Sequence, residues 1–389
     1  MLNRRLTRRD FLKFSAAAGG SALLAACGGG AAGPAACAAP TGADTIALEE
    51  LTRCAGIEGT LTTIALPHDW ANYGEIISTF RSTYNLAVNE LDPYAGSSDE
   101  LEAIKANQGS TGPQAPDVVD IGVGHTARAI DEGLLATYKV ATWDTIPLKN
   151  DDGYWWAEYY GVLSFEANLD LVDNVPEDWE DLLDPQYAGM VAMAGDPSSS
   201  NEAINTVLAA GLSRTNNDWA TAPQAGLEFW KEMVESGNFN PVTVVAGTLA
   251  SGETPIGIQW DYLAIANNDT LAGNPELAIV VPHTGVIAGP YAGGISAYAP
   301  HPYAARLWWE FVMSDQGQLL YLKGYAHPIR FNDLAARGLI DQFLVDFPDV
   351  AAKLPPAEAY EVAIFPTVEQ LVAAREHIST NWRSFVFGE

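Results

Sequence analysis

Side chains able to bind a small organic solute gather in the loops that follow predicted strands. The loop after the first predicted strand contains two aromatic rings, an acid and an imidazole, from Trp70, Tyr73, Asp69 and His68. Aromatic rings line solute pockets, and a few polar groups orient the bound molecule. A structural interpretation is also open, in which Asp69 or Asn72 caps the next helix and Trp70 packs in the core.

Two later turns also place residues suited to ligand binding directly after predicted strands. Gly124 and His125 follow the third predicted strand, where backbone N–H groups at a helix start can bind an oxyanion. His125 as a helix cap is an equal alternative. Trp260, Asp261 and Tyr262 end another strand and begin a helix. Asp261 is suited either to an amine or to the N-cap of that helix.

Three consecutive hydroxyls form the sharpest feature of the second half of the chain. Ser198, Ser199 and Ser200 precede a predicted helix, where hydroxyl donors and the positive end of the helix dipole suit a carboxylate, phosphate or phosphonate. Ser199 and Glu202 also match a capping box, which would use one hydroxyl. Glu202 disfavours a strongly charged anion. A small polar solute therefore fits this loop better than a polyanion.

The elements that must position these loops alternate between strands and helices. Strands are predicted at 60–66, 86–91 and 117–121, with a capping box at Ser97 and Glu100 before the helix between the last two. The pattern restarts after residue 168. Such alternation predicts mostly parallel sheets covered by helices on both faces, with ligands beyond the carboxyl ends of the strands. The fold class expected is α/β, with two lobes hinged around a ligand cleft.

The first residues carry an export pattern. Arg8 and Arg9 precede a hydrophobic pair and a lysine, and a short apolar run then ends at Cys27. The run is too short to span a bilayer. The pattern resembles a twin-arginine signal peptide over 1–26 with a lipoprotein cleavage site at Cys27, followed by a small-residue tether over 27–56. An unprocessed amphipathic helix is the alternative.

Charge and cysteine content limit the partners. The net charge is −29, and removal of the first 26 residues takes away five basic and one acidic residue, leaving −33. Such a surface repels nucleic acid and anionic lipid. Cys37 and Cys54 could form a disulfide outside the cytoplasm, but nothing requires one. No cysteine and histidine spacing suggests a metal site, and we expect no cofactor.

Three segments together resemble one protein family. They are Pro116–Asp120 with the helix that follows, Val175–Gly189, and Ala299–Ala305 continued through Phe311, Ser314 and Gly317. They resemble the solute-binding proteins of ABC importers, of the type II periplasmic-binding-protein architecture, in the branch with ferric-iron, phosphonate, thiamine and polyamine binders. The resemblance covers about 59–382. Each segment also has a plain account as helix and core, and Trp179 is expected in the core.

The resemblance implies two lobes that exchange the chain three times. The first lobe would comprise 57–162 and 284–323, and the second 165–281 and 326–389. It also implies a lipid-anchored extracytoplasmic monomer that delivers a small-molecule solute to a membrane permease with ATPase subunits.

The resemblance also bears on the solute. Tyr291 matches the position of an aromatic residue in polyamine binders, but the acid that accompanies it there is absent. Iron binders carry adjacent tyrosines in the second lobe, whereas Tyr159 and Tyr160 lie at the first predicted crossing. Polyamines and ferric iron are therefore disfavoured. Donors at the helix start after Ser200 favour an anionic end of the solute, and Asp69 and Asp261, if not both used as caps, favour a cationic or hydroxylated other end, so we expect a zwitterionic or phosphonate-like organic solute.

Two other functions share these features. A sensor would present its ligand to a membrane receptor rather than to a permease. A thiaminase-like enzyme would need a cysteine nucleophile, and Cys54, which precedes the first strand, lacks an activating setting. No G-x-S-x-G, H-E-x-x-H or P-loop spacing occurs. We therefore expect a binding protein and not an enzyme.

Overall fold

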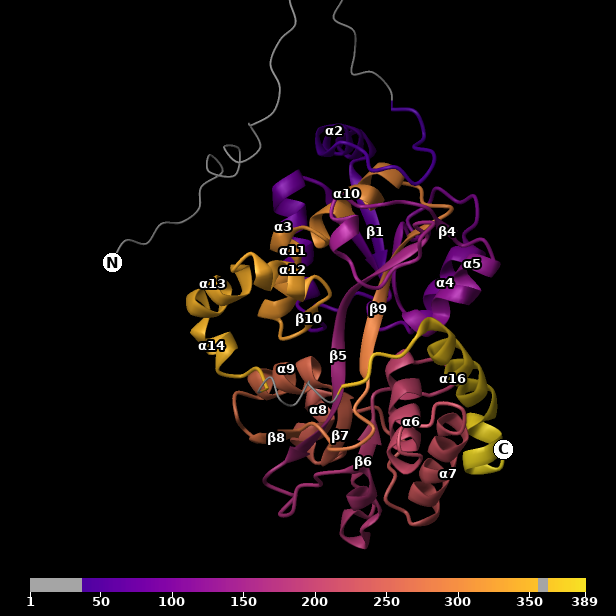
Figure 1. Ribbon diagram of the computed structural model, residues 1–389, viewed down its shortest axis with the longest axis vertical. Helices are drawn as coiled ribbons and strands as arrows, with labels where there is room; N and C mark the ends of the chain where they lie inside the picture. Colours follow the sequence, from indigo (N-terminus) through magenta and orange to yellow (C-terminus); the bar gives the residue numbers. More distant parts are fainter. Residues whose placement is uncertain (1–36, 356–362) are drawn as a thin grey trace, which may run out of the picture. The chain divides into compact units, whose positions relative to one another are not determined.

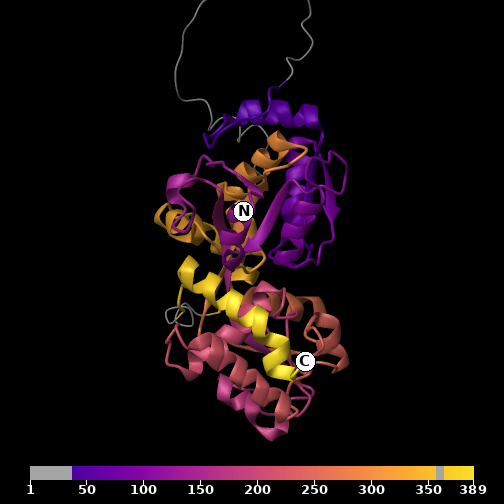
Figure 2. The ribbon, with the colours of Figure 1, turned by 90° about the vertical axis from the view of Figure 1, so that its right-hand side faces the viewer.

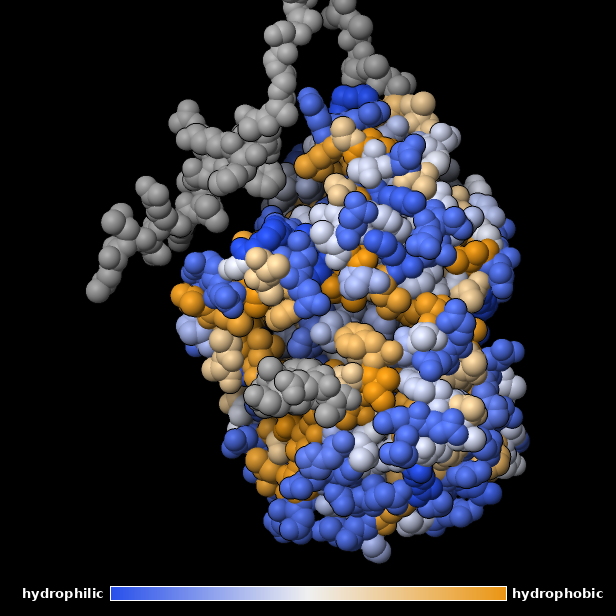
Figure 3. Space-filling view, viewed as in Figure 1, coloured by the Kyte–Doolittle hydropathy of each residue, from blue (hydrophilic) through white to orange (hydrophobic). Residues whose placement is uncertain are grey.

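The computed structural model describes residues 37–355 and 363–389. The predicted export residues Arg8 and Arg9 and the predicted lipidation site Cys27 lie outside them. By internal contacts the chain divides into residues 1–38 and a body of residues 39–389, and the body is described here by itself. Within the described ranges no helix is long and apolar enough to cross a membrane. Figure 3 shows a largely hydrophilic face with hydrophobic side chains gathered around its middle.

Strands and helices alternate through the first half of the body, close to the predicted positions. The elements are α2 (Leu48–Glu58), β1 (Thr60–Ile64), α3 (Tyr73–Tyr84), β2 (Ala87–Leu91), α4 (Ser97–Ala106), β3 (Val118–Gly122), η1 (Val123–His125), α5 (Thr126–Asp131), β4 (Leu135–Ala136), η2 (Trp143–Thr145) and β5 (Trp155–Asn168).

The second half repeats the alternation and ends in a run of helices. Its first elements are η3 (Trp179–Leu183), η4 (Pro185–Tyr187), β6 (Val191–Met193), α6 (Asn201–Arg214), α7 (Ala222–Glu235), α8 (Ala246–Ser251), β7 (Ile256–Trp260), α9 (Asp261–Leu271), β8 (Leu277–Val280) and β9 (Ala288–Ser296). The remaining elements are α10 (Pro302–Val312), α11 (Asp315–Lys323), β10 (His327–Pro328), α12 (Phe331–Ala336), α13 (Leu339–Asp346), α14 (Pro348–Ala351), α16 (Val368–Asn381) and η5 (Trp382–Phe387).

One long strand joins the two halves of the body. β5 has 14 residues; its first part pairs with β9 and β10, and its second part pairs with β7 and β8. The sheet order is β3-β9-β5-β7-β6, and β1 and β2 form a separate parallel pair. Figure 1 shows β5 and β9 running lengthwise through the middle of the body, with helices on both sides at each end.

The α/β class and the two-lobed arrangement agree with the prediction, but the sheet is mixed rather than mostly parallel. Among the described strands, β3 with β9, β9 with β5 and β5 with β7 pair antiparallel, whereas β6 with β7 and β1 with β2 run parallel. The reason is that β5 and β9 cross between lobes and run against their neighbours, so they do not follow the simple strand–helix–strand repeat.

The core sits between these layers. On the first lobe, Leu101 and Ile104 of α4 pack with Val119 and Ile121 of β3. On the second lobe, Trp179 is fully buried, as predicted, with its ring edge-on to Phe165 at 5.1 Å between centroids. Apolar residues at helical spacing thus bury one face of each helix against the sheet.

Helix α16 contacts both lobes. In the middle of this helix, Arg375 Nε donates to the carbonyl of Gly124 in η1, and two residues further on His377 Nε2 lies 3.2 Å from Gln224 Oε1 in α7. In Figure 2, α16 runs along the body from one lobe to the other.

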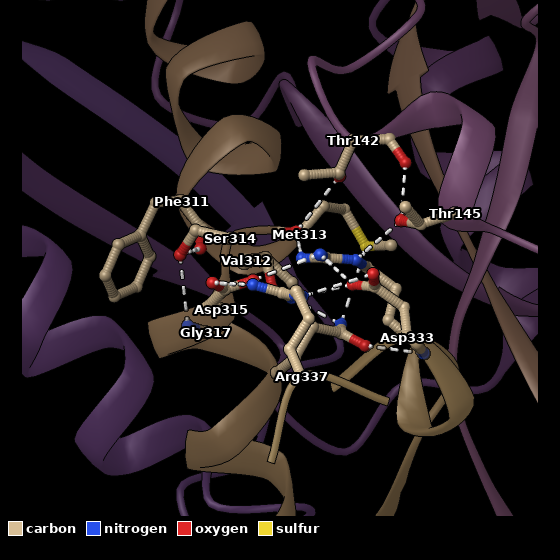
Figure 4. A network of polar contacts seen from close by, with 12 residues as sticks. Thr142, Thr145, Phe311, Val312, Met313, Ser314, Asp315, Gly317, Asp333 and Arg337 are labelled. Carbon is tan, nitrogen blue, oxygen red and sulfur yellow. Dashed lines mark hydrogen bonds and ion pairs between the residues drawn. The ribbon is translucent and has the colours of Figure 1, made fainter. Parts of the chain in front are cut away.

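An ion cluster built around a buried arginine anchors the segment after β10. The Arg330 side chain is almost fully buried; its guanidinium lies 3.0 Å from Asp315 and 2.5 Å from Asp333, and it donates to Thr145 Oγ1 at 2.7 Å. Arg337 pairs with the same two acids at 2.7 Å each. Figure 4 shows Asp315, Asp333 and Arg337 turned toward one another. Every charge in this cluster has an opposite partner, and the cluster ties α12 to α11 and η2.

Candidate functional site

Four aromatic rings from different parts of the chain meet between the lobes. This aromatic cluster consists of Trp70, Tyr159, Tyr262 and Tyr291. Trp70 stands edge-on to Tyr262 and to Tyr291, with centroids 5.9 and 5.7 Å apart, while Tyr159 stacks on Tyr291 at 5.3 Å. The three tyrosines are buried and Trp70 is half-buried. The cluster combines faces and edges of rings suited to an organic cation or a flat solute.

Each ring comes from an element that reaches the junction of the lobes. Trp70 lies in the loop after β1, Tyr159 on β5, Tyr291 on β9 and Tyr262 in the first turn of α9. Gly161 on β5 makes room for this arrangement, because a Cβ there would lie 2.5 Å from Tyr262 Cε1. Trp70, Tyr262 and Tyr291 were predicted from the sequence, and the structure brings them together.

Behind the rings lies a pair of buried carboxyl groups. Asp120 Oδ2 accepts from the hydroxyls of Tyr73 and Tyr159, each at 2.8 Å, and the Tyr159 hydroxyl accepts from Trp70 Nε1 at 2.7 Å. Glu158 accepts from the Tyr321 hydroxyl at 2.5 Å. Continuous hydrogen bonds therefore connect the rim residue Trp70 to the buried acids.

A hydrogen bond joins the two carboxyl groups, and it lowers the pKa of Asp120 and raises that of Glu158. Burial raises the pKa of Asp120 to about 6, against hydrogen bonds from Glu158, Tyr73 and Tyr159 that lower it. Burial and the neighbouring Asp120 raise the pKa of Glu158 well above its usual range. Glu158 thus keeps its proton and donates it to Asp120. Among the described residues, no lysine or arginine is a cause of either shift.

In each lobe, a glutamate in the first turn of a helix accepts a hydrogen bond from the backbone of a strand. Glu100 of α4 accepts from the backbone N–H of Asp120 at 2.9 Å, and Glu202 of α6 accepts from that of Trp260 at 2.6 Å. Burial raises both glutamate pKa values well above their usual range. The capping boxes predicted at these glutamates are wrong: each carboxyl accepts from a backbone N–H of a neighbouring strand instead of from the start of its own helix.

The predicted caps themselves differ as well. The N-cap of α4 is Gly96 rather than Ser97, whose hydroxyl accepts from the N–H of Gly122 at 3.0 Å. The N-cap of α6 is Ser200 rather than Ser199. In both cases the residue that forms the cap lies one position away from the predicted pattern.

The hydroxyl loop before α6 is partly used by the fold. Ser200 accepts from the N–H of Ala203 and donates to the carbonyl of Ala194. The N–H of Ser198 donates to Asp196 at 2.8 Å. Ser198 and Ser199 are half-buried at the start of the helix. Ser200 is therefore committed to capping, and the side chain of Ser198 also hydrogen-bonds Asp196.

Four predicted residues lie away from the aromatic cluster. His68 is exposed and pairs with Glu90 at 2.6 Å, and Asp69 is exposed beside Tyr94. Gly124 packs against α16, where its carbonyl accepts from an arginine. His125 is buried; desolvation lowers its pKa to about 3, so the ring is neutral, with Nε2 3.3 Å from Ser98 Oγ.

Trp260 and Asp261 support the cluster from behind. Trp260 Nε1 donates to the Tyr291 hydroxyl at 3.2 Å. Asp261 is fully buried and accepts from the N–H of Val162 on β5 at 2.9 Å, with His327 on β10 3.5 Å from its other oxygen. Asp261 does not cap α9 and instead joins β5 to β10.

Sequence reasoning missed Asp120, Glu158, Tyr159 and Tyr321 as site residues. Asp120 was assigned only to a buried strand, although an acid in an otherwise apolar strand is itself a signal. The tyrosine pair at 159–160 was considered only for iron. Within the described part of the chain, no group of three or more histidine, cysteine or acidic side chains could hold a metal ion.

The comparisons with known proteins agree with this geometry. The model of the bacterial extracellular solute-binding protein family matches residues 114–344, more than half of the chain, and the chain belongs to that family. Residues 2–25 match the twin-arginine translocation signal sequence. No curated protein matches. The fold and family define a solute-binding protein of an ABC transporter, exported from the cytoplasm.

Solved structures with this fold bind chemically different solutes. The chain is similar to the periplasmic binding protein AfuA from Actinobacillus pleuropneumoniae with bound fructose-6-phosphate (TM-score 0.63, 20% identity, 85% of this chain and 99% of that one). It is also similar to iron-bound HitA from Pseudomonas aeruginosa (0.62, 17%, 84% and 99%). A third is the Atu4243-GABA receptor (0.62, 16%, 85% and 98%). These identities establish the fold and leave the solute open.

Proposed function

We propose that this protein captures a small polar organic solute with a positively charged group and delivers it to an ABC permease. The observation that carries this proposal is the buried carboxyl pair Asp120–Glu158, which has tyrosine hydroxyls around it and, among the described residues, no lysine or arginine that contributes to its pKa shifts. A desolvated acid without a counter-charge attracts a cation. The aromatic cluster in front of it offers ring faces for a cation–π contact.

The other end of the solute would face the start of α6. Backbone N–H groups of the first helical turn and the half-buried Ser198 and Ser199 are donors at the positive end of the helix dipole. Glu202 in the same turn argues against a dianion. A zwitterion, with its cationic group toward Trp70 and its anionic group toward α6, matches both halves of the site. A phosphonate-like group remains compatible with the α6 end.

A thermal-shift panel of matched solutes tests the proposal. Zwitterionic amino acids, betaines and aminophosphonates should raise the melting temperature, because a ligand that binds only the folded state stabilises it by mass action. The same compounds without the cationic nitrogen are the controls. Stabilisation by ferric citrate, or by uncharged sugars as strongly as by zwitterions, would contradict the assignment and leave the transport role intact.

We also propose that the chain is anchored through lipid on Cys27. The twin-arginine signal match ends at residue 25, two residues before Cys27. Cys27→Ala should release the protein into the soluble extracytoplasmic fraction or block processing. Arg8→Lys with Arg9→Lys should retain it in the cytoplasm. Membrane attachment that persists in Cys27→Ala would refute the anchor.

We propose the lobe division 57–162 plus 284–323 and 165–281 plus 326–389. The change of pairing partners midway along β5 supports its first boundary. Across its last boundary, Arg330 contacts Thr145 and Asp315 of the first lobe. Limited proteolysis near residues 285 and 360 tests this division. If it released two stable fragments that are each one contiguous stretch of chain, the proposal that the lobes share the chain in this way would be wrong.

Binding without catalysis fits the cysteines. Cys37 and Cys54 are both disulfide-bonded. A disulfide sulfur is not a thiolate, so Cys54 cannot serve as the nucleophile of a thiaminase-like reaction. The family and the structural relatives are binding proteins. Recovery of a chemically unchanged solute after incubation would support this.

A further inference from the structure

The two lobes are in close contact at a point outside the aromatic cluster and the charged clusters described above. Gly122 ends β3 in the first lobe, and Asn201 is the first residue of α6 in the second. A Cβ placed on Gly122 would lie 2.1 Å from both Cγ and Oδ1 of Asn201, and 2.6 Å from Nδ2. Carbon atoms in contact normally stay 3.5–4.0 Å apart. The Asn201 side chain therefore occupies the space that any side chain at position 122 would need.

The backbone does not require glycine there. Gly122 has φ −57° and ψ 138°, a conformation that every residue adopts without strain. Its N–H donates to Ser97 Oγ, a bond that alanine would keep. The close approach across the lobes is thus the specific constraint at this position, and a substitution by alanine isolates it.

Asn201 is held in place on its own side. Its backbone carbonyl and its Oδ1 both accept from Asn205 Nδ2, at 2.9 and 3.3 Å, and its side chain contacts the hydroxyl of Tyr291. The residue is buried. Its amide consequently lies between the Gly122 turn and the aromatic cluster, so the contact that closes the lobes is continuous with the solute site.

We propose that Gly122 is a positioning residue for lobe closure: its missing side chain lets Asn201 dock against the end of β3 and bring α6 to the aromatic cluster. This rests on the proposed division into lobes and on no particular solute. Substitution at position 122 would hold the lobes apart while leaving each lobe folded.

The test measures the distance between the lobes. Spin labels are attached at the exposed positions Ser82→Cys in α3 and Ser251→Cys in α8, in a Cys27→Ala background, since the remaining cysteines are disulfide-bonded. The wild type should show a short distance, and Gly122→Ala should shift the distribution to longer distances. Asn201→Ala added to Gly122→Ala should restore the short distance, because it empties the contested space.

Two further variants make the result decisive. Gly247→Ala is the matched control, because nothing lies within 4 Å of a Cβ at that glycine, and it should leave the distance unchanged. Asn201→Gln enlarges the same contact from the other lobe and serves if Gly122→Ala does not fold. An unchanged short distance in Gly122→Ala or, if that variant does not fold, in Asn201→Gln overturns the proposal, as does a wild type that never shows the short distance.

A solute identified by thermal shift adds an independent readout. Its apparent affinity should fall about tenfold or more in Gly122→Ala, since binding is weakened by the fraction of molecules able to close, and recover in the double variant. If no zwitterion binds, the proposed solute class fails, while the distances still decide whether Gly122 controls closure.

Discussion

Two buried polar clusters in the same body are built on opposite rules. Around Arg330, two arginines face two aspartates, and every charge has a partner. Around Asp120, two acids face three tyrosine hydroxyls, and a proton takes the place of a cation. Matched charges like those around Arg330 are sufficient to make a protein rigid. The unmatched acid in the Asp120 cluster is therefore the better indicator of a ligand site.

The largest effect should come from the matched cluster. Arg330→Met removes the buried guanidinium and its bonds to Thr145, Asp315 and Asp333, and the free energy of unfolding should fall by about 3 kcal/mol. Denaturant titration measures this. Arg337→Ala is the control: it pairs with the same two acids but its side chain is 41% exposed, so less than about 1 kcal/mol should be lost. Equal losses in the two variants would show that burial does not distinguish them.

In the cluster around Asp120, removal of a charge should leave the free energy of unfolding unchanged or raise it. Asp120→Asn removes a buried charge and keeps an acceptor for a tyrosine hydroxyl, so stability at pH 7 should be unchanged or higher. Burial raises the pKa of Asp120 from 3.8 to about 6, so between these values the folded protein holds a proton that the unfolded chain has lost. Wild-type stability should therefore fall as pH rises through this window, by at most about 1.4 kcal/mol per pH unit.

The Asn variant should lack this part of the pH dependence. Melting temperatures of both proteins from pH 3.5 to 7.5 would show two curves that converge at low pH and separate as pH rises. Parallel curves would mean that Asp120 does not titrate in this range. A loss at pH 7 as large as that of Arg330→Met would erase the difference between the clusters.

The smallest effect compares two hydroxyls of the aromatic cluster. Tyr159→Phe leaves Trp70 Nε1 and Asp120 each short of a partner and should cost about 1.5 kcal/mol. The Tyr262 hydroxyl has no hydrogen-bond partner among the described residues, so Tyr262→Phe should be neutral in unfolding experiments. If that hydroxyl binds the solute, Tyr262→Phe should still lose affinity. If Tyr262→Phe lowered the free energy of unfolding, the Tyr262 hydroxyl would have to make a stabilising hydrogen bond in the folded protein, against this prediction.

The sequence predicts the elements of this fold better than the contacts between them. The strands near 60, 87 and 118 and the helix at 201 lie within a few residues of their predicted places, because local periodicity determines them. Glu100 and Glu202 show the limit: the same spacing fits a capping box and a bond to a distant strand. Only the tertiary arrangement places Asp120 or Trp260 within reach of these carboxyls.

The site follows the same division. Trp70, Tyr262 and Tyr291 could be predicted because aromatic residues in strand-exit loops and at crossings suit a solute site. His68 and Asp69 share the loop of Trp70 but point to the surface, which the sequence does not distinguish. Asp120 and Glu158 depend on two strands, β3 and β5, meeting β9 from opposite sides, and no local pattern brings them together.

The unbroken path of β5 through both lobes also has a mechanical consequence. An extended strand of 14 residues cannot lengthen, but the dihedral angles along it can each twist slightly at little cost. Together with β9, it resists stretching along the strand direction and allows twisting about that direction. Relative motion of the lobes should therefore be a rotation about this pair of strands rather than a separation, so that residues far from the strands travel furthest while Tyr159 and Tyr291 stay nearly still.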